Sequence, residues 1–409
     1  MIYKSQKLAK VSYDIRGPIY QKSQEILRSG ESILQLNIGN PAPYGFHAPK
    51  HLIDAVSSQI EKAQGYVSSN GIDEARTAIR DNAEKQGISG VSEQDVYIGN
   101  GVSELISIAL QVLLNPEDEI LLPAPDYPLW TSTVHLFGGK AVHYLCDESS
   151  NWFPDLADLE RKITPKTKAL VLINPNNPTG AVYPKELLEK MVAIAKSNNL
   201  LIFSDEIYDR IVFDGVKHIP TASIDSDVPC ITFGGLSKNY MATGFRAGWL
   251  VVSGKKHFDK SFFDGLDILM SMRLCSNALA QLAIKPALEG VQEIDELVLP
   301  KGRLKEQRDF AYEKLISIEG ISCVKPQGAL YMFPKFDSEI LDIENDSDFV
   351  FDLLTEQKVL VVQGSGFNWK KPDHFRITFL PSIDMLDEAI GKIGQFTGKY
   401  LKDRQAVTA

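Results

Sequence analysis

Four short segments of the sequence carry side chains that can do chemistry together. They are residues 174–180 (NPNNPTG), 204–208 (SDEIY), 234–248 (GGLSKNYMATGFRAG) and 375–379 (FRITF). Between them they supply a lysine, an aspartate, a tyrosine, an asparagine and two arginines, namely Lys238, Asp205, Tyr208, Asn177, Arg246 and Arg376. A lysine amine can attack a carbonyl carbon and form a covalent bond with it. Arginine guanidinium groups bind carboxylates and phosphates.

Each segment also has a simpler explanation when it is taken alone. Residues 174–180 could be only a tight turn, in which Asn177–Pro178 is a candidate cis peptide bond. Asp205 could cap the next helix, and Arg376 could face water. Their joint occurrence after apolar runs favours a functional site, because a carboxylate there is costly to desolvate unless it meets a cation. A lysine between Gly-rich turns and buried strands is also more often functional than a surface lysine, since desolvation lowers its pKa.

This combination of side chains is the set that pyridoxal phosphate (PLP) chemistry requires. A lysine amine binds the cofactor covalently, and an aspartate keeps the pyridine nitrogen protonated. Hydrogen-bond donors tune the phenolic oxygen of the ring, while basic side chains and backbone N–H groups hold the phosphate. The sequence therefore predicts a PLP site.

The elements that must position these residues are read from hydrophobic patterning. Seven short apolar runs are expected strands: residues 95–99, 119–123, 140–144, 169–174, 200–205, 231–234 and 247–252. Amphipathic segments lie between them, most clearly residues 184–198, which predict a helix that starts with Pro184. This alternation predicts an α/β fold with a mainly parallel, doubly wound sheet, whose strand ends carry the site.

The pattern changes after residue 252. Helical segments dominate to about residue 318, and strand-like runs follow at 329–333, 359–362 and 375–379. We expect three parts: an N-terminal segment (1–48) that packs on the small domain, a large cofactor-binding domain (49–290) and a small α/β domain (291–409).

Composition excludes several classes of protein. Lys and Arg number 43 against 53 Asp and Glu, a net charge of −10, which makes nucleic acid or an anionic membrane a poor partner. The N-terminus has no apolar run of signal-peptide length and no stretch is long enough to span a bilayer, so a cytoplasmic protein is expected. The four cysteines lie far apart and are expected as reduced thiols.

Other motifs carry little weight. Residues 99–104 (GNGVSE) lack the third glycine of a dinucleotide fingerprint, and no P-loop or GxSxG motif occurs. His47 and His51 have metal-ligand spacing, but Pro49 separates them and no Glu completes the motif, so no metal is expected.

The chain resembles the class I/II aminotransferases, which are PLP enzymes of fold type I, and the resemblance covers nearly its whole length. It implies a large domain with a seven-stranded, mainly parallel sheet between helices, plus a smaller α/β domain. It implies that Lys238 holds the cofactor and later shuttles the α-proton, while Asp205 pairs with the ring nitrogen. The other cofactor-binding residues that it implies are Gly101, Val102, Ser103, Tyr127, Asn177, Tyr208, Ser237, Arg246 and, reaching the partner subunit's phosphate in a homodimer, Tyr66.

The resemblance also implies that Arg376 binds the substrate α-carboxylate, with Asn177 and Gly39 beside it. One departure is clear. Many relatives have a serine three residues before the lysine, where this chain has Gly235, so Ser237 or backbone groups are expected to hold the phosphate instead.

Two further segments narrow the substrate. Residues 13–18 (YDIRGP) resemble a segment of alanine aminotransferases, and residues 271–277 (SMRLCSN) resemble the bacterial glutamate–pyruvate aminotransferases. Glutamate needs a second cation for its distal carboxylate, whereas alanine and pyruvate need only space. Arg16, with Tyr13 beside it, is favoured over Arg273 for that role, and a salt bridge on the surface or at an interface is the simpler explanation of either arginine. The resemblance implies a ping-pong transfer between glutamate and pyruvate that makes alanine.

Alternative functions stay open at this point. Another transaminase, for aspartate, aromatic or branched-chain substrates, or a PLP-dependent C–S β-lyase would use the same fold. A lyase needs no distal cation, so residues 13–18 argue weakly against it. A PLP-binding regulator of transcription is disfavoured, because the first 50 or so residues carry no helix-turn-helix pattern.

Overall fold

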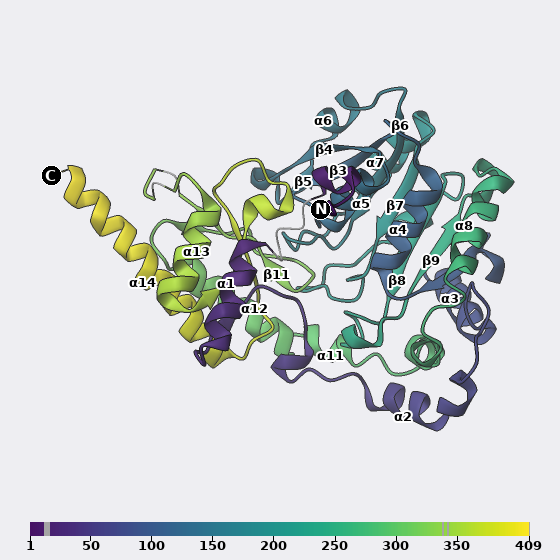
Figure 1. Cartoon of the computed structure of the whole chain (residues 1–409), viewed down its shortest axis with the longest axis horizontal. Coiled ribbons are helices and arrows are strands. Elements are labelled where there is room, and N and C mark those ends of the chain that lie inside the picture. Colours follow the sequence, from purple (N-terminus) through teal and green to yellow (C-terminus); the bar gives the residue numbers. More distant parts are fainter. Residues whose placement is uncertain (12–16, 338, 342, 409) are drawn as a thin grey trace.

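The computed structural model describes the chain except residues 12–16, 338, 342 and 409, and it leaves the side chains of residues 10 and 402–408 undescribed. Tyr13 and Arg16 therefore lie outside the described residues. Figure 1 shows the polypeptide as a broad sheet flanked by helices, joined to a smaller, mostly helical part that ends in the long helix α14.

The centre of the structure is an eight-stranded sheet with the order β2-β9-β8-β7-β6-β3-β4-β5. Strands β8, β7, β6, β3 and β4 run parallel, and β9 is antiparallel to both of its neighbours. The strands are β2 (Val96–Gly99), β3 (Glu119–Ala124), β4 (Lys140–Asp147), β5 (Phe153–Pro154), β6 (Thr167–Ile173), β7 (Leu201–Asp205), β8 (Cys230–Gly235) and β9 (Gly248–Ser253). All seven expected strands are confirmed.

The expected number of seven strands is wrong by one, because the two-residue strand β5 adds to the edge. A 3-10 turn at Glu148–Ser150 is followed by Asn151 and Trp152, both in the left-handed region (φ 59° and 62°). This turn reverses the chain, so that Phe153 and Pro154 pair antiparallel with Asp147 and Cys146. Two residues are too few to show strand periodicity in the sequence.

Helices cover both faces of the sheet (Figure 1), which is why strands such as β3, β7 and β9 are buried at every position rather than at alternate ones. One face packs on α4 (Val102–Leu113), α5 (Leu129–Leu136) and α8 (Lys260–Met272). The other face packs on α2 (Lys50–Ser58), α3 (Asp73–Lys85), α7 (Lys185–Ser197) and α10 (Ile284–Glu289). The predicted helix 184–198 is confirmed as α7, with Pro184 as its N-cap residue.

A separate hydrophobic cluster holds the smaller part together. It unites α1 (Pro18–Arg28), α12 (Arg303–Ile316), α13 (Asp346–Gln357) and α14 (Ile383–Thr408) around β11 (Tyr331–Met332) and β15 (Phe375–Thr378). The strand β14 (Val362–Gln363) pairs with β15. The predicted strand 359–362 is split, because β13 (Val359–Leu360) pairs with β1 (Leu34–Gln35) whereas β14 pairs with β15. The remaining elements are α6 (Leu156–Arg161), α9 (Ala278–Gln281), α11 (Ile294–Val298), β10 (Ile321–Ser322) and β12 (Lys335–Phe336).

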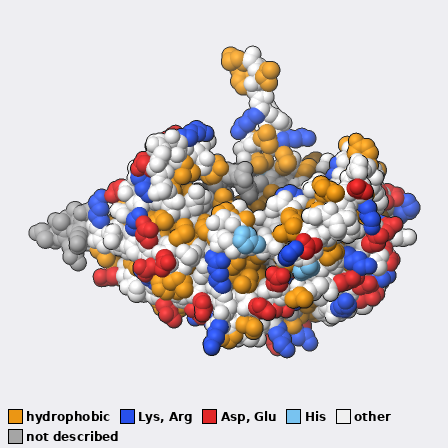
Figure 2. All heavy atoms as spheres, turned by 90° about the horizontal axis from the view of Figure 1, so that it is seen from below, with side chains coloured by type: hydrophobic (Ala, Val, Ile, Leu, Met, Phe, Trp, Pro, Cys, Tyr) orange, Lys and Arg blue, Asp and Glu red, His pale blue; other side chains and the backbone are white. Residues whose placement is uncertain are grey.

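The N-terminal segment contacts this smaller part through α1 against α13 and β1 against β13. The domain boundaries at residues 48 and 290 stay predictions. Acidic and basic side chains are interspersed over the face in Figure 2. No helix among the described residues is both long and apolar enough to cross a bilayer.

Candidate active site

A cavity of about 490 Å³ opens at the carboxyl ends of the parallel strands. Eleven of the residues singled out from the sequence line it, and they come from segments up to 337 residues apart in the chain. They are Gly39, Val102, Ser103, Tyr127, Asn177, Asp205, Tyr208, Ser237, Lys238, Arg246 and Arg376. The topology brings them together because β6, β7 and β8 end side by side at this edge of the sheet.

Lys238 lies in the loop after β8, and its Nζ donates a hydrogen bond to the carbonyl oxygen of Gly39 (2.7 Å). Burial lowers the pKa of Lys238, and Arg376 and Arg246 act in the same direction, while Tyr331 and Asp205 partly oppose them. A lysine whose pKa is lowered spends more time as the neutral amine, which is the nucleophilic form.

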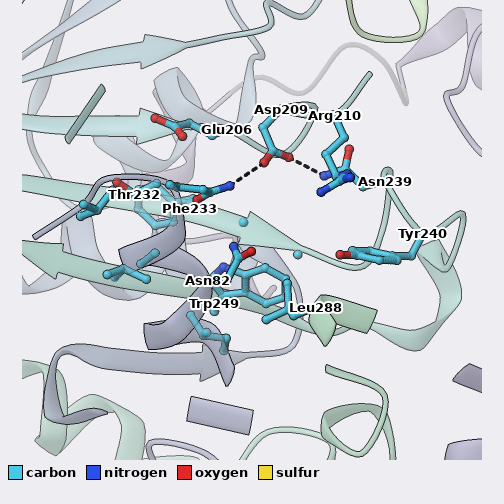
Figure 3. A pocket seen from close by; sticks show the side chains of 17 residues that line it. Asn82, Glu206, Asp209, Arg210, Thr232, Phe233, Asn239, Tyr240, Trp249 and Leu288 are labelled. Atoms are coloured by element: carbon cyan, nitrogen blue, oxygen red, sulfur yellow. Dashed lines mark hydrogen bonds between the residues drawn. The ribbon is translucent and has the colours of Figure 1, made fainter. Parts of the chain in front are cut away.

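A small pocket lies beside the loop that carries Lys238 (Figure 3). Hydrogen bonds between residues that line this pocket hold the loop in place. Asn239 Nδ2 donates to Asp209 Oδ1, and Gln86 Nε2 on the segment after α3 donates to Asp209 Oδ2 (3.2 Å). Asp209 thus ties the residue next to the lysine to the end of α3. This contact limits the freedom of the lysine backbone.

Asp205 ends β7 and is 4% exposed. Trp130 Nε1 donates to its Oδ2 (3.3 Å), and the backbone N–H of Ile207 donates to its Oδ1 (3.4 Å). Burial raises the pKa of Asp205 to about 6. Among the described residues no lysine or arginine forms an ion pair with it, and the attraction of Lys238 offsets only part of the cost of burying the carboxylate.

Arg246 and the start of α4 form a cradle for an anion. The Arg246 guanidinium donates to the carbonyl oxygens of Thr243 (3.0 Å) and Asn100 (3.2 Å). Gly101 has φ +85°, and a Cβ on it would lie 2.5 Å from Arg246 Nη2, so only glycine fits. Val102 and Ser103 begin the twelve-residue helix α4, whose first N–H groups have no partner within the helix.

Gly235 explains the departure from the related sequences. A Cβ at this position would lie 3.0 Å from the carbonyl oxygen of Ala247 and 3.2 Å from Gly248 Cα, which is tighter than ordinary van der Waals contact. A serine therefore fits poorly at Gly235, and Ser237 lines the cavity instead.

Arg376 lies on β15 and is 3% exposed. Its Nη1 donates to Asn177 Oδ1 (2.9 Å) and its Nη2 to the carbonyl oxygen of Asn37 (2.5 Å). The guanidinium carbon lies 4.2 Å from the Tyr331 ring centroid and 4.6 Å from that of Phe367. The predicted cis bond at Asn177–Pro178 is present, in the loop that also places the Asn177 side chain.

The sequence analysis missed Tyr331, Trp130 and Asn37. Tyr331 lies in a segment that was assigned only as a strand, although β11 pairs with β15 and so shares its end of the cavity with Arg376. The sequence does not show this, because residues 329–333 and 375–379 become neighbours only through the pairing of the two strands. Trp130 could not be found, because its contact with Asp205 depends on how α5 packs on β7.

Two expected residues that the structure describes, Tyr66 and Arg273, do not line the cavity of this chain. Tyr66 is 81% exposed on the surface. Arg273 donates from Nη2 to the carbonyl oxygen of Ile98 (2.8 Å), and its Nε lies 3.4 Å from Glu104 Oε2, at the start of α4. Tyr13 and Arg16 are outside the described residues. In the part of the chain that the structure describes, no cluster of side chains suits a metal ion.

Comparison with known proteins places this geometry in a family. Residues 31–393 match the family described as aminotransferase class I and II. The chain is 54% identical, over 97% of its length and 98% of the relative, to the glutamate-pyruvate aminotransferase AlaA of Haemophilus influenzae. It is 53% identical, over 97% of its length and 92% of the relative, to the alanine aminotransferase of Mycobacterium tuberculosis.

Solved structures agree. The crystal structure of an aminotransferase from Escherichia coli superposes with a TM-score of 0.97 at 53% identity, covering 98% of this chain and 99% of that one. The alanine aminotransferase of Pyrococcus furiosus superposes with a TM-score of 0.92 at 38% identity, covering 97% and 100%. Class I and II aminotransferases are PLP-dependent. The chain belongs to this family, and it has the fold-type I architecture of these enzymes.

Proposed function

We propose that the protein is a glutamate–pyruvate aminotransferase, which interconverts L-alanine and 2-oxoglutarate with pyruvate and L-glutamate. The observation that carries the proposal is the joint placement of Lys238, Asp205 and Arg376 around one cavity. The names of the relatives that are 53–54% identical over nearly the whole chain support the choice of these substrates.

The residues around the cavity fit PLP. The buried Asp205 carboxylate would pair with the protonated ring nitrogen, which would supply a cation in direct contact with it. Tyr127 would lie on the ring face, and Asn177 and Tyr208 would bind the phenolic oxygen. Ser237, Arg246 and the N–H groups at residues 101–103 would hold the phosphate, in a cradle that a Cβ on Gly101 would fill. When bound, PLP supplies an electron-accepting ring that stabilises negative charge on the substrate Cα.

The remaining chemistry belongs to the side chains of this chain. Arg376 would bind the substrate α-carboxylate with its planar guanidinium, which Asn177, Asn37 and two aromatic rings hold in place. This fixes the Cα–H bond relative to Lys238. The Lys238 amine, with its lowered pKa, would take the α-proton and later return it.

The distal carboxylate of glutamate needs a further cation. We keep Arg16 as the preferred residue, because Arg273 has its guanidinium against Ile98 and Glu104. We further propose a cytoplasmic homodimer with shared active sites, in which the exposed Tyr66 reaches the phosphate bound by the partner subunit. We expect a large domain (49–290) and a small domain (291–409). The contacts of α1 with α13 and of β1 with β13 support the expected packing of the N-terminal segment (1–48) on the small domain, although Gln6–Lys10 contacts α5 of the large domain.

Replacement of the lysine tests the proposal. Lys238→Ala is expected to abolish amino transfer between alanine and 2-oxoglutarate while PLP still binds non-covalently, because the ring, phosphate and carboxylate contacts remain. Full activity of this variant would contradict the proposal. The wild-type protein should also release no pyruvate and ammonia from cysteine-type substrates without a 2-oxo acid. Such release would favour the β-lyase instead.

A further inference from the structure

Tyr331 is a buried tyrosine at the end of the cavity that carries Arg376. It lies on β11, is 4% exposed, and pairs with Thr378 on β15. Because Thr378 is two residues beyond Arg376 on the same strand, the backbone positions of Tyr331 and Arg376 are fixed relative to each other. The side chain of Tyr331 contacts three of the residues assigned to cofactor or substrate.

The hydroxyl of Tyr331 receives a hydrogen bond from Tyr208. The distance between the two Oη atoms is 3.2 Å, and the rings meet edge to face with centroids 6.1 Å apart. Burial raises the pKa of Tyr208 well above its ordinary value, so this phenol keeps its proton and acts as a donor. A phenol has only one proton to donate. Any second acceptor for Tyr208 therefore competes with Tyr331.

The same hydroxyl fills the space beside Gly39. A Cβ on Gly39 would lie 2.1 Å from Tyr331 Oη and 2.7 Å from Cζ. The glycine therefore leaves room for Tyr331 as well as for substrate. This close fit keeps the Tyr331 hydroxyl within hydrogen-bond distance of Tyr208. It also places the hydroxyl beside Gly39, whose carbonyl oxygen accepts a hydrogen bond from Lys238.

The ring of Tyr331 supports the arginine. Arg376 Cζ lies 4.2 Å from the ring centroid, which is a cation–π contact at a buried site. Two of the guanidinium nitrogens donate hydrogen bonds, to Asn177 and to the carbonyl oxygen of Asn37. The Tyr331 ring packs against the guanidinium carbon and so restricts how the group can rotate.

We propose that Tyr331 is a positioning residue with two separable parts: its ring orients Arg376 for the α-carboxylate, and its hydroxyl competes with the phenolic oxygen of PLP for the Tyr208 proton. The proposal rests on the roles proposed above for Tyr208 and Arg376. A donated hydrogen bond favours the ionised form of the group that receives it. By sharing the Tyr208 proton, Tyr331 raises the pH at which the bound cofactor loses its own proton.

The hydroxyl is tested by titrating the visible absorbance of the PLP-bound protein with pH. Tyr331→Phe should shift the midpoint to lower pH by about 0.5–1 unit, because Tyr208 then donates fully to the cofactor. Tyr208→Phe should shift it to higher pH, and adding Tyr331→Phe to that variant should change nothing more. As a matched control, Tyr44→Phe removes a hydroxyl that donates to the Gln35 carbonyl oxygen outside the cavity, and it should leave the midpoint unchanged.

Three results would overturn the competition. The first is a titration midpoint in Tyr331→Phe that is unchanged or raised. The second is a midpoint shift caused by Tyr331→Phe that is the same in the wild type and in Tyr208→Phe. The third is a Tyr208→Phe variant whose midpoint equals that of the wild type. The proposed function fails by a different result, a visible band that is the same in Lys238→Ala as in the wild type.

The ring is tested by the Michaelis constant for the amino acid. Tyr331→Phe keeps the ring, so its KM for L-alanine should stay within about twofold of the wild-type value. Tyr331→Leu removes the ring and should raise KM by about 3- to 30-fold, the range expected for a desolvated cation–π contact. Equal KM values for the Phe and Leu variants would refute this part of the proposal.

Discussion

Asp205→Asn should make the cofactor-free protein more stable above pH 6. The pKa of Asp205 is raised from 3.8 to about 6, chiefly because burial disfavours the charged carboxylate. Each pKa unit corresponds to 1.36 kcal/mol, so about two units amount to about 3 kcal/mol of destabilisation when the group is ionised. Asparagine has a similar shape, carries no charge, and can still accept from Trp130 Nε1.

The pH dependence gives the prediction its sign. Below the unfolded pKa near 3.8 the carboxyl is neutral in both states and costs nothing. As the pH rises from 3.8 to 6, the unfolded state loses its proton first, so stability falls. Above pH 6 the full cost is present. The advantage of Asp205→Asn should therefore be small at pH 4 and reach about 3 kcal/mol at pH 8.

The assay is denaturant unfolding of the cofactor-free protein, followed by tryptophan fluorescence at pH 4, 6 and 8. Asp54→Asn serves as the control, because Asp54 is a solvent-exposed aspartate on α2. Addition of PLP should reverse the order at pH 8, since only the wild type gains a charge pair. An equal difference at all three pH values, or a less stable Asp205→Asn protein at pH 8, would refute the argument.

Three further substitutions test other residues assigned to substrate or cofactor. Gly39→Ala places a methyl group 2.1 Å from Tyr331 Oη. In steady-state assays kcat/KM for L-alanine should therefore fall by about 10- to 100-fold, the equivalent of one or two lost hydrogen bonds. Adding Tyr331→Phe removes the clashing hydroxyl and should recover part of this loss. No recovery in the double variant would place the clash elsewhere. Arg16→Ala should raise KM for glutamate and leave KM for alanine unchanged. Arg273→Ala should instead speed the loss of PLP on dialysis, because Arg273 donates to the Ile98 carbonyl oxygen at the end of β2 and contacts Glu104 on α4. A selective loss of glutamate in Arg273→Ala would reverse these assignments.

Much of the fold could be predicted from the sequence, because strands buried on both faces are apolar throughout. The seven expected strands were found from short apolar runs, and the helix α7 was found from its apolar stripe and the proline that precedes it. The edge strand β5 could not be found, since it depends on left-handed backbone at Asn151 and Trp152 rather than on periodicity. The split of residues 359–362 depends on two different pairing partners, which the apolar run VLVV does not encode.

The residues of the cavity could be named because glycines, prolines and charges interrupt apolar runs at the strand ends. Asp205 and Arg376 were recognised as charges in apolar surroundings, and both are buried. Tyr331 was missed because a tyrosine in a strand looks the same whether it packs in a core or faces a cavity. Arg273 shows the converse: its motif is distinctive, but a guanidinium that binds the Ile98 carbonyl looks the same in sequence as one that binds substrate.

The visible spectrum of the purified PLP-bound protein, recorded before and after addition of L-alanine and then 2-oxoglutarate, tests the central claim most directly. We predict that the cofactor band bleaches with alanine and returns with 2-oxoglutarate, because each half-reaction is then complete. A cofactor band that is present but unaffected by alanine would contradict the glutamate–pyruvate assignment and move the substrate to another amino acid or the reaction to a lyase.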